Sequence, residues 1–299
     1  MLRRPILAAA DSPPVRGFVD RYGMRLGAQR FVAGESLDQA VVVLRRLNEQ
    51  GLRTNTTLLG ENVRDRDEAE QVTATYEEVL CRIDAEQLET NLSVKPTQLG
   101  AVIDRELVYA NLERLVAEAG RLGNFVRIDM EDTPFTDLTL ALYRRLREAG
   151  HDNVGTVLQA YLYRTADDLE SLLPLTPNLR IVKGAYKEPP HLAYPKKADV
   201  DAAYDRLVTR SIEAGGFTAV ATHDEARIDH ALSLGAGPDR MELQMLFGVR
   251  PQLQLDLVRR GHRVLVATPY GPDWYPYLMR RLAERPANLL FFAKNAIRG

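Results

Sequence analysis

The sequence has 299 residues, 45% of them hydrophobic, and its formal net charge at pH 7 is −2. That length suits one domain with a sizeable core, and the near-neutral charge argues against nucleic-acid binding, which needs a concentrated positive surface. Cys81 is the only cysteine, so a disulfide framework and a cysteine-rich metal site are both excluded. Because Cys81 falls in a helical run, we expect it to be a small packed side chain.

Residues 1–52 come before the first expected strand. Residues 1–10 hold two arginines and an apolar run led by Pro5, shorter than the ~7–15 apolar residues of a secretory signal, so we expect no signal peptide. Ser36 and Gln39 form a capping-box pattern, and a helical periodicity follows until Gly51. We therefore expect 1–52 to be a helical arm on the outside or bottom of the main domain. No segment approaches the ~18–20 apolar residues of a membrane span.

Eight short runs rich in apolar and β-branched residues alternate with amphipathic helical stretches. The runs are 53–59, 91–94, 125–130, 155–161, 179–182, 218–222, 241–246 and 263–267. Helix signals include a start at Thr136 with a stop at Gly150, and a start at Thr165 with acidic residues in its first turn. Alternation of this kind predicts parallel β-α-β units. Eight units predict an α/β fold, a closed (β/α)8 TIM-like barrel over 53–299, more readily than an open doubly wound sheet.

The functional residues of such a barrel lie where its strands end. The polar residues at or near these ends are Lys95, Asp129, Glu131, Asp132, Gln159, Tyr161, Arg180, Lys183, Tyr186, Thr222, His223, Asp224 and Gln244. The longest irregular stretch, 187–197, follows the fifth run, where a barrel keeps its working loops.

A helix after the last strand carries Tyr277, Arg280, Arg281 and Glu284 on one face, since their spacing is i, i+3, i+4 and i+7. Two arginines beside a tyrosine would clamp a carboxylate, because guanidinium groups bind carboxylates through two parallel hydrogen bonds. Arginine pairs also recur on helices expected to face solvent, as at Arg144 and Arg145. The position directly after the last strand favours a functional pair here.

Several other readings of these residues stay open. Lys95 and Lys183 are either interior ion-pair lysines or, in an aldolase, the amine that forms a Schiff base. Asp129, Glu131 and Asp132 would be the core of a metal-dependent hydrolase, although the many nearby cations argue against a metal. His223 has no histidine partner at i+4, which disfavours zinc. No Gly-x-Gly-x-x-Gly follows a strand, so a Rossmann-type dinucleotide site is not expected.

Seven segments together resemble the proline dehydrogenase family, especially its monofunctional bacterial members. They are 92–96 (LSVKP), 127–131 (RIDME), 157–161 (VLQAY), 180–186 (RIVKGAY), 221–224 (ATHD), 242–246 (ELQML) and 275–282 (YPYLMRRL). They follow the order of the family and extend from the second strand to the last helix. The most specific are 180–186 and the paired arginines. The resemblance implies a β/α barrel that binds FAD at its strand ends and oxidises L-proline to 1-pyrroline-5-carboxylate by hydride transfer to flavin N5.

The resemblance also implies roles for individual residues. Asp129 would organise Lys95 and the substrate amine, Arg180 would lie against the flavin ring, and Glu61 would pair with Arg280 as a gate. The remaining substrate contacts would be Lys95, Tyr186, Leu246, Tyr277, Arg280 and Arg281. Those to FAD would be Met130, Gln159, Arg180, Lys183, Gly184, Ala185, Thr222, His223, Gln244 and Glu284. A quinone would take up the electrons, which implies a cytoplasmic protein or one peripheral at the inner membrane, meeting the membrane surface transiently.

One position departs from the family pattern. Segment 266–271 (VATPYG) has Ala267 where family members usually carry a tyrosine. Unless Tyr270 or a neighbour fills the space, we expect a larger substrate pocket, with weaker proline binding or tolerance of hydroxyproline. The missing ring also leaves open a barrel that binds FAD and a ligand without turning the ligand over.

Overall fold

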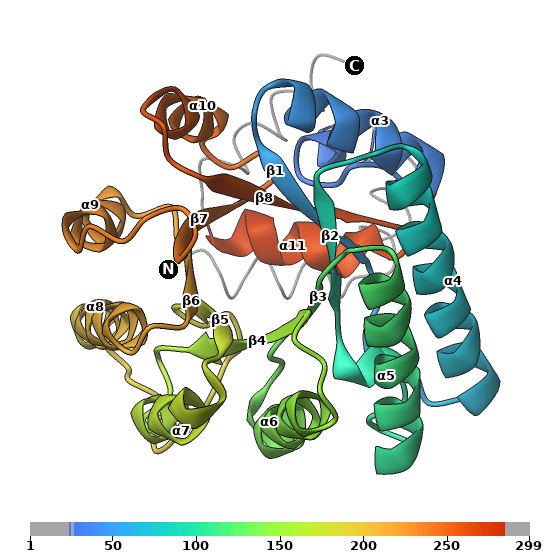
Figure 1. Cartoon of the computed structure of the whole chain (residues 1–299), viewed down its shortest axis with the longest axis horizontal. Coiled ribbons are helices and arrows are strands. Elements are labelled where there is room, and N and C mark those ends of the chain that lie inside the picture. Colours follow the sequence, from blue (N-terminus) through green and yellow to red (C-terminus); the bar gives the residue numbers. More distant parts are fainter. Residues whose placement is uncertain (1–23, 25–26, 285–299) are drawn as a thin grey trace.

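A closed barrel of eight parallel strands forms the centre of the computed structural model, which describes Met24 and residues 27–284 (Figure 1). The strands are β1 (Arg53–Leu58), β2 (Thr90–Val94), β3 (Val126–Ile128), β4 (Val154–Gln159), β5 (Asn178–Val182), β6 (Phe217–Ala221), β7 (Met241–Leu246) and β8 (Val264–Tyr270). Each strand pairs with the next along the chain, and β8 pairs with β1. The (β/α)8 prediction is confirmed and the open-sheet alternative is wrong. The prediction about residues 1–10 lies outside the described residues.

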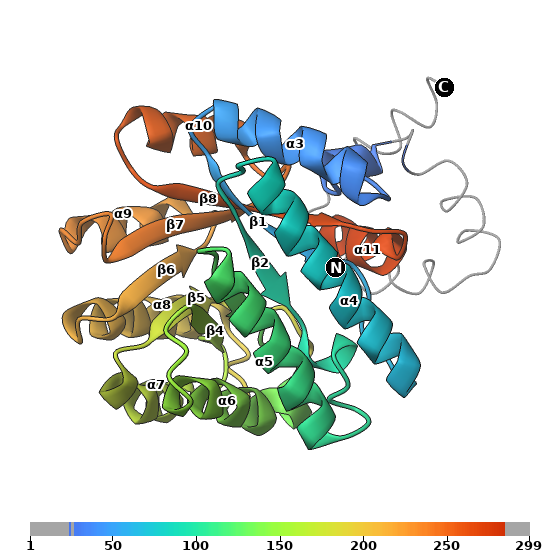
Figure 2. The same ribbon diagram turned by 45° about the vertical axis from the view of Figure 1, so that its right-hand side comes forward.

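A helix follows every strand. These helices are α4 (Arg66–Ala85), α5 (Arg105–Arg121), α6 (Thr133–Glu148), α7 (Thr165–Leu172), α8 (Lys197–Glu213), α9 (Glu225–Ser233), α10 (Pro251–Arg259) and α11 (Trp274–Glu284). Helices α4 to α10 surround the strands, whereas α11 crosses the middle of the ring (Figure 1). Turning the view shows α11 beyond the ends of β1 and β8 (Figure 2). Within the part of the chain that the structure describes, no helix combines the length and apolar character needed to cross a bilayer.

The strand alternation sends apolar side chains outward and many polar ones inward. On β3, Val126 and Ile128 belong to the core beneath the helices, while Arg127 between them faces the other way. On β5, Leu179 and Ile181 are fully buried in the same core, and Arg180 lies between them. Two arginines therefore enter the barrel because their strands alternate.

Because α11 lies across the barrel, a helix of the N-terminal arm takes the position in the outer ring that α11 would otherwise occupy. Helix α3 (Leu37–Glu49) packs on β1 and β8. Ser36 accepts a hydrogen bond from the Gln39 amide, as the capping pattern predicts, and Gln39 accepts one from the backbone of Glu35. Before α3, the short helix η1 (Ala28–Arg30) leads into Phe31 and Val32. Phe31, Val32, Leu59, Trp274 and Leu278 pack in one cluster that seats α11 over the barrel.

Two local predictions are wrong. Helix α6 begins at Thr133, three residues before the predicted start, with Pro134 in its first turn. The Thr133 amide donates to Glu188, 2.8 Å away in the β5–α8 loop, so a distant carboxylate stabilises the early start. Cys81 is exposed rather than packed, and its thiol lies 3.8 Å from Glu118.

Gly248 joins the arm to the barrel, and replacing it tests that contact. Its φ is 73°, and a Cβ there would lie 1.6 Å from the carbonyl oxygen of Arg30. Gly235 is the matched control, because its φ is 69° and a Cβ would meet nothing within 4 Å. We expect Gly248→Ala to lower the free energy of unfolding by about 1–3 kcal/mol more than Gly235→Ala, measured by denaturant titration. Equal losses would show that the arm does not press on this loop.

Candidate active site

One large cavity opens at the C-terminal ends of the strands. Its volume is about 1070 Å³, and all eight strands or their following loops contribute to its lining, together with α11. The predicted site residues that line it are Glu61, Lys95, Asp129, Met130, Gln159, Arg180, Lys183, Gly184, Ala185, Tyr186, Thr222, His223, Gln244, Leu246, Tyr277, Arg280 and Arg281. Glu284 is the last residue of α11, and its side chain lies outside the described part of the structure. Sequence segments separated by more than two hundred residues thus meet in one space.

Arg180 holds a guanidinium near the middle of the barrel. Its Nε donates to Gln244 at 2.5 Å and its Nη1 to Asp129 at 2.8 Å. Its Nη2 donates to Ser93 at 3.2 Å and to Asn55 at 3.4 Å. The side chain is only 11% exposed, so these acceptors compensate for the water that the charge loses on burial. Arg180 therefore presents a fixed cation to the cavity.

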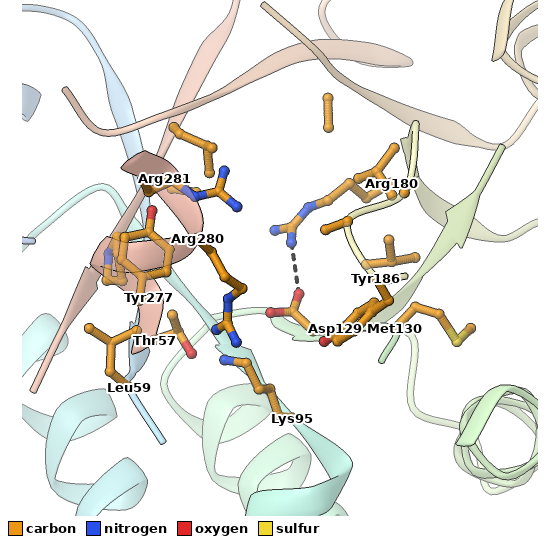
Figure 3. Close-up of a pocket in the computed structure, with 18 of the residues that line it drawn as sticks. Thr57, Leu59, Lys95, Asp129, Met130, Arg180, Tyr186, Tyr277, Arg280 and Arg281 are labelled. Carbon is orange, nitrogen blue, oxygen red and sulfur yellow. Dashed lines mark hydrogen bonds and ion pairs between the residues drawn. The ribbon is translucent and has the colours of Figure 1, made fainter. Parts of the chain in front are cut away.

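Asp129 pairs with an arginine that the sequence analysis did not link to it. The Asp129 carboxylate forms an ion pair with Arg180 (Figure 3). Both groups sit on inward-facing positions, Asp129 directly after β3 and Arg180 within β5. In Figure 3 the Lys95 amine lies beside Arg280, below the Asp129 carboxylate.

The predicted face of α11 is turned into the cavity. Figure 3 shows Arg280 and Arg281 directed toward the space in front of Arg180 and Asp129. Arg280 pairs with Glu61 of the β1–α4 loop at 2.8 Å, which is the pairing that the resemblance implied. The Arg281 guanidinium lies 5.3 Å from the centre of the Tyr277 ring, within reach of a cation–π interaction. Lys95 and the two arginines make this end of the cavity suited to an anion.

The opposite wall of the cavity includes Tyr186, in the β5–α8 loop. Burial raises the pKa of Tyr186 well above its usual value, so the phenol stays neutral. The loop is tied to its surroundings by the contact between Glu188 and Thr133 and by a backbone hydrogen bond from Tyr163 to Leu192. Sequence patterns did not identify Glu188, because its partner is a helix end more than fifty residues away.

Lys183 is already held by carboxylates. Its ammonium donates to Asp201 at 2.5 Å and to Asp224 at 2.8 Å. The hydrogen bond from Lys183 is the main reason why the pKa of Asp224 falls to about 2. A Schiff-base lysine needs an amine that is free to attack a carbonyl, whereas this one is held by two carboxylates. The arrangement disfavours the aldolase alternative.

The three carboxylates of the metal-hydrolase alternative have separate surroundings. Asp129 pairs with Arg180, whereas Glu131 accepts hydrogen bonds from the amide and the hydroxyl of Thr97. Asp132 takes the N-cap position of α6. The arrangement therefore offers no shared set of oxygen ligands from these three side chains.

The space beside Ala267 is not filled by Tyr270. Ala267 and Pro269 face the cavity, whereas Tyr270, on the opposite face of β8, is buried in the core beneath the helices. The pairing of β8 places Ala267 beside Asn55 of β1 and Leu246 of β7. Asn55, Thr57 and Pro269 are lining residues that the sequence analysis missed. Strand alternation would have indicated Asn55 and Thr57, which belong to no recognisable motif, whereas Pro269 lies in the 266–271 segment already compared with the family.

Comparison with known proteins places the chain in a family. A family model described as proline dehydrogenase matches residues 40–294. Proline dehydrogenase 1 of Bacillus subtilis (strain 168) is 40% identical over 302 residues, covering 100% of both chains. Proline dehydrogenase of Deinococcus radiodurans is 41% identical over 310 residues, covering 100% of this chain and 99% of its own.

Solved structures agree with this assignment. The crystal structure of proline utilization A from Bdellovibrio bacteriovorus, a protein inactivated there by N-propargylglycine, matches with a TM-score of 0.81. The two sequences are 25% identical, and the match covers 89% of this chain. A mutant of proline utilization A from Bradyrhizobium japonicum is 22% identical with a TM-score of 0.75, and shares the fold. The match covers 33% of each of those longer chains. The chain belongs to the proline dehydrogenase family.

Proposed function

We propose that this enzyme oxidises L-proline to 1-pyrroline-5-carboxylate with bound FAD and passes the electrons to a quinone. The observation that carries the proposal is the meeting, in one cavity, of Lys95, Arg280 and Arg281 with the partly buried Arg180–Asp129 pair. One end of the cavity is suited to a carboxylate, and its centre offers a fixed cation. Family membership supports the same reaction and is the ground for the quinone and for contact with a membrane surface.

The residues around Arg180 fit a flavin. Gln159, Gln244, Thr222 and His223 supply amide, hydroxyl and imidazole groups to a cavity at the upper end of the ~300–1,000 Å³ typical of ligand sites. His223 accepts a hydrogen bond on Nε2 from the Leu246 amide, which fixes its ring. The other contacts that we propose are Met130, Lys183, Gly184 and Ala185, with Glu284 from the end of α11. When bound, FAD supplies N5 as the hydride acceptor for the C–H bond beside the ring nitrogen.

We propose that the chain's own residues prepare the substrate for that transfer. Arg280, Arg281 and Lys95 hold the carboxylate, and Tyr186, Tyr277 and Leu246 surround the ring. The same cations lower the proton affinity of the substrate amine, whose lone pair must be available for oxidation. Arg180, fixed by its acceptors, stabilises negative charge at the centre of the cavity without reorganising. Glu61 keeps Arg280 in place as a gate, and Asp129 holds Arg180 and lies near the amine.

Removing Arg280 tests the carboxylate contact. We expect Arg280→Met to lower kcat/KM for proline about 100-fold, a loss of about 3 kcal/mol, because a desolvated carboxylate loses a charged partner. With pyrrolidine, which has the same ring and no carboxylate, the loss should largely disappear. The kcat/KM of Arg280→Lys for proline should lie between those of wild type and Arg280→Met, because lysine keeps the charge but lacks the planar guanidinium that binds a carboxylate through two hydrogen bonds.

Arg259→Met is the matched control for this measurement. Arg259 is an exposed helix arginine in α10, paired with Asp256 at i,i+3. Its replacement should leave kcat/KM for proline and for pyrrolidine within about twofold of wild type, since exposed ion pairs contribute little. A similar loss for proline and pyrrolidine in Arg280→Met would contradict a carboxylate-binding role.

A second candidate substrate, hydroxyproline, follows from the space at Ala267. Ala267→Tyr should lower the KM for proline and raise the KM for hydroxyproline, each by up to about tenfold, because a ring would refill the lining. Ala267→Phe separates the effect of the ring from that of the hydroxyl. Steady-state kinetics with both substrates measure the change. Unchanged Michaelis constants in Ala267→Tyr would show that this position does not set the choice of ring.

A further inference from the structure

Thr97 connects two loops at the anion-binding end of the cavity. It belongs to the short helix η2 (Pro96–Gln98), which directly follows Lys95. Its hydroxyl lies 3.1 Å from the amide of Asn62, which donates to it, and its carbonyl accepts from Val63 at 3.0 Å. Asn62 and Val63 follow Glu61, the partner of Arg280. Thr97 therefore touches the backbone on one side of Glu61.

Glu131 fixes Thr97 from the other side. Its Oε2 accepts from the Thr97 amide at 2.9 Å, and its Oε1 accepts from the Thr97 hydroxyl at 2.6 Å. Glu131 and Thr97 are only 3% and 1% exposed. The Glu131 carbonyl accepts a further hydrogen bond from Gln159 at 2.9 Å. Burying a carboxylate without hydrogen-bond donors costs free energy, so the two donors from Thr97 make this a specific contact.

The loop that carries Glu61 is also shaped for this contact. Asn62 has a φ of 59°, the left-handed region that Asn tolerates better than most residues. Gly60 has a φ of 144°, and a Cβ there would lie 2.9 Å from the Gln98 side chain. Gln98 donates to the Leu58 carbonyl at 3.2 Å and accepts from Tyr76 at 2.9 Å. Thus η2 holds the loop on both sides of Glu61.

We propose that Glu131 and Thr97 are positioning residues that set the place of Glu61, and through it Arg280, for the substrate carboxylate. This inference rests on the proposed function. The directions of the hydrogen bonds explain why a carboxylate is needed. When Glu131 is ionised, the Thr97 hydroxyl donates to it, and its oxygen is free to accept from Asn62. When Glu131 carries a proton on Oε1, it donates to the Thr97 hydroxyl and no longer accepts the hydroxyl proton, so the hydroxyl must turn and its contact with Asn62 weakens.

The charge state of Glu131 changes near neutral pH. Burial raises its pKa to about 7, against the opposing effect of the hydrogen bonds from Thr97. The charged or titratable groups that face it are Lys95 at the end of β2, Glu61 in the β1–α4 loop and Tyr186 in the β5–α8 loop. Lys95 favours the ionised form, and Glu61 opposes it.

The test compares Thr97→Val with wild type in the FAD-bound enzyme. The readouts are kcat and KM for proline and pyrrolidine, and the Kd of tetrahydrofuran-2-carboxylate, which keeps the carboxylate and has no amine to oxidise. We expect about tenfold weaker binding of the carboxylate and a matching rise in KM for proline, with little change for pyrrolidine. Thr97→Ser should restore binding, because it restores the hydroxyl.

Thr139→Val is the matched control, since Thr139 is fully buried in α6 and its hydroxyl donates to the Phe135 carbonyl of its own helix. It should leave every readout near wild type. Unchanged Kd and KM in Thr97→Val would overturn the inference, and so would equal losses for proline and pyrrolidine. If wild type fails to oxidise proline, the proposed function is wrong, and the Kd of the carboxylate still tests the position of Arg280.

Glu131→Gln tests the charge. Below pH 7 the wild-type carboxyl is also neutral, so the two proteins should bind tetrahydrofuran-2-carboxylate alike near pH 6. Above pH 7 the wild-type group is ionised and the amide is not, so the ratio of the variant Kd to the wild-type Kd should rise severalfold by pH 8. A ratio that stays constant between pH 6 and pH 8 would exclude a part for the charge of Glu131.

Discussion

The burial of the Arg180 charge inside the barrel is the constraint on which the site depends. A guanidinium that is 11% exposed must have acceptors around it, and β1, β2, β7 and the end of β3 each supply one. Gln244, one of those acceptors, is itself held by Glu242, which also pairs with Arg263. Replacing an acceptor on any one of these strands therefore changes the environment of the Arg180 charge, which the other strands also contact. This requirement explains a polar layer where barrels usually pack branched apolar residues.

A second constraint comes from the placing of α11. Because this helix crosses the strand ends instead of covering β8 from outside, it carries Arg280 and Arg281 into the cavity, and α3 takes the outer position. Trp274 donates to Glu35 at 2.8 Å, so the arm and the last helix hold one another. Both ends of the described chain thus contribute to the site: the N-terminal arm supports α11, and α11 supplies side chains to the cavity.

The sequence was sufficient to predict the eight strands, the barrel and most of the lining of the cavity, because parallel strands have a strong apolar pattern and the motifs are specific. It was not sufficient for contacts between distant loops. The partner of Asp129 depends on how β3 and β5 face each other across the barrel, and the start of α6 depends on Glu188. Asn55 and Thr57 have no motif of their own and enter the site only through the register of β1. The exposure of Cys81 depends on which face of α4 packs inward, and Cys is compatible with either face.

The most direct test of the central claim is the visible spectrum of the purified protein, recorded without oxygen before and after L-proline is added. The proposed function predicts a yellow protein whose flavin absorbance bleaches on addition of proline, because a flavin bound in the cavity would accept hydride from the proline ring. A protein that stays colourless after reconstitution with FAD would contradict it.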